Sequence, residues 1–421
     1  MTSIAGIGII AGLGLAGLLL ASLVVGQLLW AWAGVRLQQE LRPTSGLSPR
    51  SRRSFRGTLA LGMGLLLLLL AGEALAVRTV RQGALSPREP LHRVIVYVSD
   101  ANGSNDLWIM DEYGRTRALT FEKSNERRPR WSPDGQWILF VSNAAGNDDL
   151  YVISPEGRGQ WPLTRTPEEE GWASWGPGGD EVLFTRRAAD GDRLCILRLD
   201  VLKRTVLEDR CVFATDGRIN KPSFSPDGRR IVFNLGHDGL YRLWIVDRDG
   251  REARALDPTA QSGIAAWSPD GTRIAYRRAA DYNRPSDVTV IAPDGSEPRH
   301  IRHIEAAQVQ ANWSPDGRWL AFMSNRSDPP LEAMKRLGVV RADGSELRWL
   351  DLGVCWLYDQ AQSWQIETWD EHNRILYNRL VEDQRDLFLV YADGRRRVRL
   401  TETPANEFHA VFRPVPPLKQ R

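Results

Sequence analysis

The pentapeptide Trp131-Ser-Pro-Asp-Gly135 decides the fold, because close copies of it recur along the chain. The copies are Phe224-Ser-Pro-Asp-Gly228, Trp267-Ser-Pro-Asp-Gly271 and Trp313-Ser-Pro-Asp-Gly317, with a weaker one at Trp175-Gly-Pro-Gly-Gly179. Proline sets φ at the first corner and glycine adopts a positive φ without steric cost, so the phrase predicts a tight turn. An apolar and aromatic run such as Trp137-Ile-Leu-Phe-Val141 follows, which is typical of a strand. The sequence therefore predicts an all-β repeat architecture.

The spacing of the repeats predicts a β-propeller. Successive units begin 43 to 56 residues apart, at Trp131, Trp175, Phe224, Trp267, Trp313 and, with a shorter turn, Trp369. This is close to the roughly 40–50 residues of a four-stranded blade.

The two ends of the array are each incomplete. The segments 93–98 and 106–110 resemble middle strands, and 409–414 resembles a leading strand without followers. We predict that the C-terminal strand completes the N-terminal blade, which closes a ring of seven blades and removes free sheet edges. Six or eight blades remain alternatives, because Trp364 offers another register for the last unit.

These units resemble the propeller repeat of the TolB family, also called the WD40-like PD40 repeat. The resemblance lies in the Ser-Pro-Asp-Gly corner, a Ser-Asp or Ser-Asn turn, an Asp-Leu-Trp or Asp-Leu-Tyr strand and a Leu-Thr ending, as in 98–120 and 141–164. It covers about residues 92–415 and implies a TolB-like propeller, without implying one activity. Related propellers precede hydrolase domains in prolyl-oligopeptidase-like enzymes, but no Gly-x-Ser-x-Gly nucleophile elbow occurs in this sequence. We therefore expect no enzyme, and no catalytic, cofactor-binding or metal-ligating residue is assigned.

Two apolar segments stand where TolB proteins carry a small α/β domain. Residues 4–35 and 58–77 are each long enough to cross a bilayer, and the segment 36–57 between them holds six arginines and one glutamate. Because positive loops stay in the cytoplasm, we predict a two-pass anchor with the propeller on the extracytoplasmic side of the cell membrane. The expected organisation is a first transmembrane helix at 1–35, a cytoplasmic loop at 36–57, a second helix at 58–77, a linker at 78–91, the propeller at 92–415 and a tail at 416–421.

Charge and cysteine content limit the function classes. The chain after residue 91 carries a net charge of −3, so no basic domain indicates nucleic-acid binding. Cys195 and Cys211 lie in two strands that flank a turn, nearly opposite each other. An extracytoplasmic location permits a disulfide there, and two buried free thiols are the alternative. Cys355 has no evident disulfide partner in the sequence.

Four further groups of residues are candidate sites. The turn Asp100–Asp106 has oxygen side chains at alternate positions that could hold calcium, although a hairpin turn needs the same residues. His300 and His303 point to opposite faces of a strand, which argues against a shared metal. Trp356 and Trp364 form either an exposed recognition patch or core. Solvated loop charges are expected at Asp190, Asp192, Asp281 and Asp287.

The sequence favours a membrane-anchored propeller that binds a protein or an envelope component through loops at one face of the ring. Two alternatives remain: a hydrolase or lyase with its site in the central channel, and an accessory subunit of a larger membrane complex.

Overall fold

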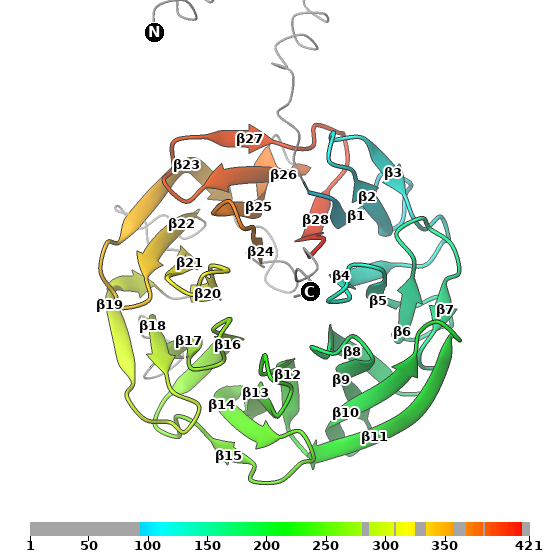
Figure 1. The fold of residues 1–421 in the computed structure, drawn as a ribbon, viewed down its shortest axis with the longest axis horizontal. Coiled ribbons are helices and arrows are strands. Elements are labelled where there is room, and N and C mark those ends of the chain that lie inside the picture. Colours follow the sequence, from blue (N-terminus) through cyan, green and yellow to red (C-terminus); the bar gives the residue numbers. More distant parts are fainter. Residues whose placement is uncertain are drawn as a thin grey trace, which may run out of the picture. The chain divides into compact units, whose positions relative to one another are not determined.

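Seven antiparallel sheets of four strands each surround one axis (Figure 1). The structure is a computed structural model that describes residues 93–279, 286–306, 309–324, 334–356, 368–381 and 384–414. The expected segments 4–35, 36–57, 58–77 and 78–91, the tail, Trp364 and Asp281 lie outside these residues. Within the described ranges, no helix is long and apolar enough to cross a membrane. The predicted seven-bladed, all-β propeller is confirmed.

The sheets are numbered here as blades 1 to 7, each given from its innermost to its outermost strand. Blade 1 contains β28 (Glu407–Phe412), β1 (Ile95–Ser99), β2 (Asp106–Met110) and β3 (Thr116–Ala118). Blade 2 contains β4 (Glu126–Trp131), β5 (Ile138–Ser142), β6 (Asp149–Ile153) and β7 (Trp161–Pro162). Blade 3 contains β8 (Glu169–Trp175), β9 (Glu181–Ala188), β10 (Gly191–Asp200) and β11 (Thr205–Thr215). Blade 4 contains β12 (Arg218–Phe224), β13 (Arg230–His237), β14 (Leu240–Asp247) and β15 (Arg254–Ala255). Blade 5 contains β16 (Gln261–Trp267), β17 (Ile274–Ala279), β18 (Ser286–Ile291) and β19 (Arg299–Ala306). Blade 6 contains β20 (Val309–Trp313), β21 (Trp319–Ser324), β22 (Met334–Arg341) and β23 (Arg348–Trp356). Blade 7 contains β24 (Thr368–Trp369), β25 (Arg374–Val381), β26 (Gln384–Tyr391) and β27 (Arg397–Arg399).

The C-terminal strand closes the ring. Strand β28 pairs antiparallel with β1, with Ile95 opposite Phe412 and Ser99 opposite Glu407 (Figure 1). The indole of Trp131 in blade 2 donates a hydrogen bond of 3.1 Å to the carbonyl oxygen of Val411. The predicted completion of the N-terminal blade by the C-terminal strand is therefore confirmed.

The Ser-Pro-Asp-Gly turns satisfy their own polar groups. In all four copies the serine hydroxyl donates to the aspartate carboxylate at 2.5–2.6 Å, and the glycine N–H donates to the serine carbonyl at 2.8–2.9 Å. The glycines have φ between +66° and +70°, which the turn requires. A Cβ on Gly271 would lie 3.4 Å from Pro226 of the preceding blade, so adjacent turns also pack closely.

The last blade uses a variant of this turn. The backbone N–H of Asn373 donates to the carbonyl of Asp370, and Asn373 takes a φ of +56° where other blades have glycine. The Asp370 carboxylate accepts the backbone N–H groups of His372 and Arg374 at 2.9 Å. Asparagine tolerates this conformation better than most residues, which explains how blade 7 forms without the motif. The unit that starts at Trp369 is thus confirmed.

Apolar contacts and indole hydrogen bonds join neighbouring blades. Each hydrophobic cluster contains residues of two adjacent sheets, such as Leu139 of β5 with Phe184 of β9. The indoles of Trp175, Trp267 and Trp313 donate to carbonyl oxygens of the preceding innermost strand at 3.0–3.4 Å. Each accepting residue directly precedes the aromatic residue of that strand, so the bond repeats with the blade.

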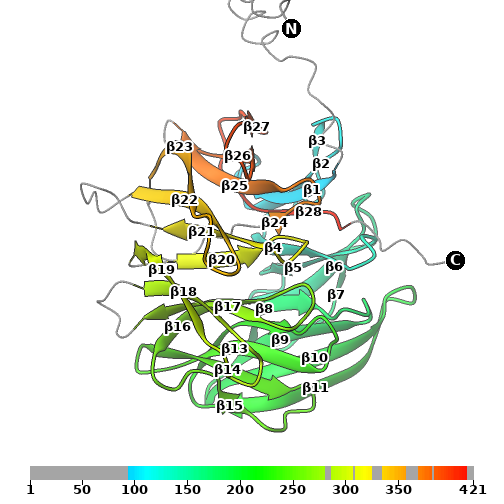
Figure 2. The same ribbon diagram turned by 60° about the vertical axis from the view of Figure 1, so that its left-hand side comes forward.

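Blade 3 carries a covalent link at its outer edge. Cys195 on β10 and Cys211 on β11 are cross-strand partners and form a disulfide bond. Strand β11 is the outermost of its sheet and much longer than β7 or β15 (Figure 2). The disulfide holds this long hairpin together. The sequence left a disulfide and two free thiols as alternatives, and the structure contains the disulfide.

We expect the indole hydrogen bond between blades to contribute measurably to stability. Trp313→Phe removes the donor to Ala266 and should lower the free energy of unfolding by about 1 kcal/mol. Trp369→Phe is the matched control, because the buried Trp369 Nε1 has no hydrogen-bond partner among the described residues. Thermal melts of both variants test this, and equal losses would contradict it.

The disulfide should stabilise the propeller, because it closes a loop between two residues that are 16 positions apart. Cys211→Ser is expected to cost about 2–4 kcal/mol, because the unfolded chain gains conformational freedom. Melting with and without reductant measures the effect. A reductant should destabilise the native chain and leave the Cys211→Ser variant unchanged; a native melting temperature insensitive to reduction would refute the expectation.

Candidate functional site

The ring has two faces with different construction. The turn face carries the Ser-Pro-Asp-Gly turns and the turns between the third and fourth strands of each blade. The connection face carries the segments that join successive blades and the turns between the second and third strands. The turn face therefore repeats from blade to blade, whereas the connection face is built from segments of different sequence and length.

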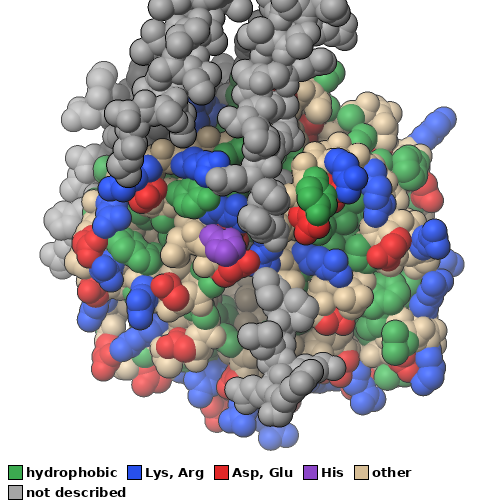
Figure 3. Space-filling model, turned by 45° about the horizontal axis from the view of Figure 1, so that its top comes forward, with side chains coloured by type: hydrophobic (Ala, Val, Ile, Leu, Met, Phe, Trp, Pro, Cys, Tyr) green, Lys and Arg blue, Asp and Glu red, His purple; other side chains and the backbone are tan. Residues whose placement is uncertain are grey.

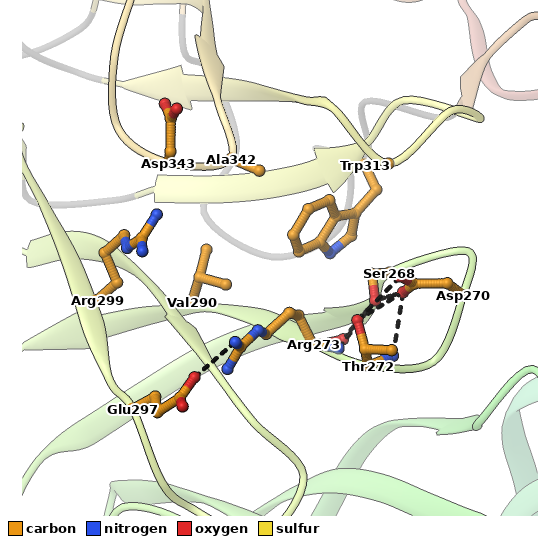
Figure 4. A pocket seen from close by; sticks show the side chains of 11 residues that line it. Ser268, Asp270, Thr272, Arg273, Val290, Glu297, Arg299, Trp313, Ala342 and Asp343 are labelled. Atoms are coloured by element: carbon orange, nitrogen blue, oxygen red, sulfur yellow. Dashed lines mark hydrogen bonds and ion pairs between the residues drawn. The ribbon is translucent and has the colours of Figure 1, made fainter.

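A pocket of about 290 Å³ lies between blades 5 and 6 on the turn face (Figure 4). Ser268 and Thr272 donate to Asp270 at 2.6 and 2.9 Å, and Arg273 forms a 2.6 Å ion pair with Glu297. Arg299 and Asp343 lie across the pocket from each other (Figure 4).

Similar pockets of about 420 and 280 Å³ lie between blades 1 and 2 and between blades 6 and 7. The pocket is thus a groove that the repeat produces, and hydrogen bonds within it satisfy many of its polar groups.

The turn Asp100–Asp106 uses its oxygen atoms to hold blade 1 together. The Asp100 carboxylate accepts the backbone and side-chain N–H groups of Asn406 at 2.7 and 2.8 Å, and Asp106 accepts from Asn102 at 3.0 Å. Within the described part of the chain, no group of three or more His, Cys, Asp or Glu side chains is placed to hold a metal ion.

The expectation for Asp192 was wrong. Asp192 is buried between blades 3 and 4, where it accepts the backbone N–H of Ile219 at 2.9 Å and pairs with Arg218 at 3.2 Å. Asp192 thus satisfies a buried backbone donor of β12, the first strand of the next blade. Asp190 is exposed and pairs with Arg193, as expected for a loop charge, and Asp287 is half-buried.

His300 interacts with Thr289 at 2.9 Å. The side chains of His303, Cys355 and Trp356 lie outside the described part.

Buried clusters of threonine and carboxylate line the connection face. The Thr120 hydroxyl oxygen lies 3.2 Å from a carboxylate oxygen of Asp106 and 3.1 Å from one of Glu126. The Thr401 hydroxyl oxygen lies 3.0 Å from a carboxylate oxygen of Glu407. Burial raises the pKa of Glu126, and it raises the pKa of Glu407 to about 7. The sequence reading missed these clusters, although the six-residue spacing of Thr120–Glu126, Thr164–Glu170 and Thr401–Glu407 was an available signal.

A cationic and aromatic cluster occupies the inner wall near the same face. Arg128 on β4, Trp172 on β8 and Lys221 on β12 are half-buried residues of three adjacent innermost strands (Figure 1). The Arg128 Cζ lies 3.9 Å from the centroid of the Trp172 ring, and the Lys221 Nζ lies 5.3 Å from the same ring. The sequence analysis did not single out these three residues. Each lies three positions before the aromatic residue that begins the tight turn of its blade, and this shared spacing could have indicated that they are equivalent.

Charges of both signs lie on the face that is visible in Figure 3. The face displayed in Figure 3 shows Lys or Arg beside Asp or Glu side chains, without a large area of one sign.

These features define a closed seven-bladed β-propeller whose two faces offer the candidate binding surfaces. The family model described as the TolB beta propeller domain (PD40) matches residues 73–264. This match confirms the resemblance to the TolB-like propeller family.

Two curated relatives match shorter stretches. An uncharacterized protein of Agrobacterium fabrum is 30% identical over 121 residues, which is 26% of this chain and 40% of that protein. The Tol-Pal system protein TolB of Anaeromyxobacter dehalogenans is 30% identical over 92 residues, which is 22% of this chain and 21% of that protein. The matched stretches therefore span less than half the length of these relatives.

A solved structure shares the fold at lower identity. An oligogalacturonate lyase from Vibrio parahaemolyticus matches with a TM-score of 0.55 and 15% identity, over 70% of this chain and 85% of the lyase. This likeness concerns the fold alone.

The raised pKa of Glu407 predicts how stability depends on pH. The folded state holds the proton more tightly than the unfolded chain, whose glutamate pKa is about 4.3. The protonated Glu407 therefore contributes fully to the free energy of unfolding at low pH, and this contribution is lost as the pH rises toward about 7. Relative to the native chain, Glu407→Gln should gain at least about 1 kcal/mol of stability between pH 5 and pH 8.

Thermal melts at several pH values measure this difference. Glu112→Gln, a change at an exposed glutamate, is the control and should show no such trend. A constant difference between Glu407→Gln and the native chain across this range would contradict the prediction.

Proposed function

We propose that the protein is an extracytoplasmic protein-interaction module, held at the cell membrane by residues 4–35 and 58–77. The observation that carries the proposal is the TolB-like propeller itself, since the matched Anaeromyxobacter relative is by its name a component of the Tol-Pal system. A rigid ring that presents loops of varied sequence is suited to binding a protein partner.

Two further observations support the extracytoplasmic location. The Cys195–Cys211 disulfide fits an oxidising compartment, because the cytoplasm keeps thiols reduced. The six arginines of the segment 36–57 favour a cytoplasmic position for that loop.

The binding surface proposed here is the connection face. Polar groups of the turn face are largely bound within the repeats, whereas the connection face carries the exposed Phe121, with 76% of its surface accessible, in the segment between blades 1 and 2. An exposed aromatic side chain in a varied loop is a frequent contact residue in protein interfaces.

The redox state of the cysteines in cells tests the location. In a Cys355→Ser background, acid quenching followed by maleimide labelling should find no free thiols before reduction and two after it. Two free thiols at the moment of quenching would refute the extracytoplasmic assignment.

Site-specific photo-cross-linking tests the interaction. p-Benzoylphenylalanine in place of Phe121 should produce a discrete protein adduct in cells. The same replacement of Tyr113, an aromatic residue with 59% exposure on the turn face, is the matched control and should not. Absence of an adduct at Phe121, or equal adducts at both positions, would overturn the proposal.

A further inference from the structure

Two buried carboxyl groups enclose the segment that carries Phe121. Asp106 begins β2 and Glu126 begins β4, and both residues are at most 1% exposed. Thr120 lies between them in space and directly precedes Phe121 in the chain. Its hydroxyl oxygen is 3.2 Å from a carboxylate oxygen of Asp106 and 3.1 Å from one of Glu126. The segment 120–126 is therefore held at both ends by contacts with one acidic pair.

A single hydroxyl group has too few hydrogens for two carboxylates. A threonine hydroxyl donates one hydrogen and accepts through two lone pairs. The backbone N–H of Leu107 donates to the Thr120 hydroxyl oxygen at 2.9 Å, which uses one lone pair. The one hydrogen of Thr120 reaches one carboxylate, so the other carboxyl group faces the remaining lone pair. That contact is a hydrogen bond only when the second carboxyl group carries a proton and donates it.

The other oxygen of each carboxyl group already has donors. Oε1 of Glu126 accepts from the hydroxyls of Ser124 and Ser142 at 2.6 and 3.0 Å. Oδ2 of Asp106 accepts from the side-chain amide of Asn102 at 3.0 Å. The oxygens that face the threonine are thus the places for the proton. Because two groups share it, its titration belongs to the pair rather than to one residue.

The two neighbouring interfaces contain the equivalent acidic pair together with an arginine. Between blades 7 and 1, Arg399 lies 2.5 Å from Asp386. Between blades 2 and 3, Arg186 lies 2.9 Å from Glu170. A positive charge beside a buried carboxylate favours its ionised form. Each of these pairs can therefore hold at least one negative charge that the protein itself balances.

The pair between blades 1 and 2 has no such cation. Among the described residues, neither Asp106 nor Glu126 forms an ion pair. Tyr151 on β6 is a further acid whose charge interacts with that of Glu126. Full ionisation would bury two negative charges without a positive one, which is costly. The charged side chains on the adjoining elements are Asp100 with its partner Asn406, Arg127 with its partner Asp148, Asp149 on β6, and the exposed Glu122, Lys123 and Arg165.

The pKa shifts agree with this hydrogen-bond count. Burial raises the pKa of Glu126, and the charge of Asp106 raises it further, while the hydroxyl donors offset part of the rise. Burial likewise raises the pKa of Asp106. In the folded chain, the pair therefore keeps a proton above the pH at which an exposed carboxyl group loses it.

Resting on the proposed function, we propose that one proton shared by Asp106 and Glu126 controls the presentation of Phe121 to its protein partner. With the proton bound, both carboxyl groups contact Thr120 and hold the segment 120–126 in place. Without it, the two anions repel each other and draw in water, which releases the segment. Partner binding is therefore strongest at low pH and is lost as the pH rises through the titration of the pair.

Fluorine NMR of the purified full chain in detergent tests this switch, with 4-trifluoromethylphenylalanine in place of Phe121. The fluorine resonance should change with pH, with a midpoint above the ordinary range of a carboxyl group. Glu126→Gln should abolish the transition in that range. Its amide oxygen accepts from Ser124 and Ser142, and its NH2 group donates to Thr120, so the variant reproduces the hydrogen bonds of the protonated acid.

Two further variants separate the switch from a general effect of charge. Glu122→Gln removes an exposed carboxylate of the same segment and should leave the midpoint within about 0.3 pH unit. Ala118→Arg supplies the missing cation, because Ala118 lies opposite Trp108 as Arg399 lies opposite Phe388 in blade 7. It should lower the midpoint by about one pH unit or more.

Cross-linking from position 121 connects the switch with the partner. In permeabilised cells, the yield of the p-benzoylphenylalanine adduct should fall about fivefold or more from about pH 5 to about pH 8. In the Glu126→Gln background, the yield should change less than about twofold over the same range, because the segment then stays in one state.

Three outcomes overturn the inference: a fluorine resonance that does not titrate above the ordinary carboxyl range, the same titration in Glu126→Gln, or an adduct yield that is independent of pH. Each of them leaves the interaction module standing as long as an adduct forms. An adduct that forms at no pH refutes the proposed function instead, and the fluorine titration then decides by itself whether the proton moves Phe121.

Discussion

The pairing of β28 with β1 is the contact on which the rest of the structure depends. It joins residues more than 300 positions apart and turns seven separate sheets into a ring. A linear array would leave one innermost strand missing and two sheet faces without a neighbour. Across the seam, the Trp131 indole donates to the Val411 carbonyl, as the equivalent indoles do between other blades, and Arg413 donates to the Gly135 carbonyl.

Once the ring is closed, its two faces obey different constraints. On the turn face the same serine, aspartate and glycine contacts recur, because each turn must pack against the one before it. On the connection face, serine and threonine hydroxyls donate to the buried carboxyl groups of Glu126 and Glu407. Burial favours the protonated acid, and hydrogen bonding offsets part of that cost.

The inner wall is where these constraints meet. Blades converge toward the axis, so residues of three adjacent strands come within contact distance although they stand 44 and 49 positions apart. The bulge that turns Arg128, Trp172 and Lys221 into the left-handed region recurs in three adjacent innermost strands and places these residues together.

The sequence alone determined those features of the fold that depend on residues close together in the chain. The Ser-Pro-Asp-Gly corners, the blade start at Trp369 and the strand that closes blade 1 could all be predicted, because turn chemistry and strand alternation are local and repeat at a regular period. The pairing of Cys195 with Cys211 could be placed across a hairpin, although the state of the thiols stayed open.

Only the tertiary structure decided the environment of groups at blade interfaces. Asp192 looks like a loop charge until β12 is placed beside it, and the buried carboxyl clusters and the Arg128–Trp172–Lys221 stack exist only because neighbouring sheets meet. Burial and charge pairing depend on distance in space, which a linear spacing of residues does not specify.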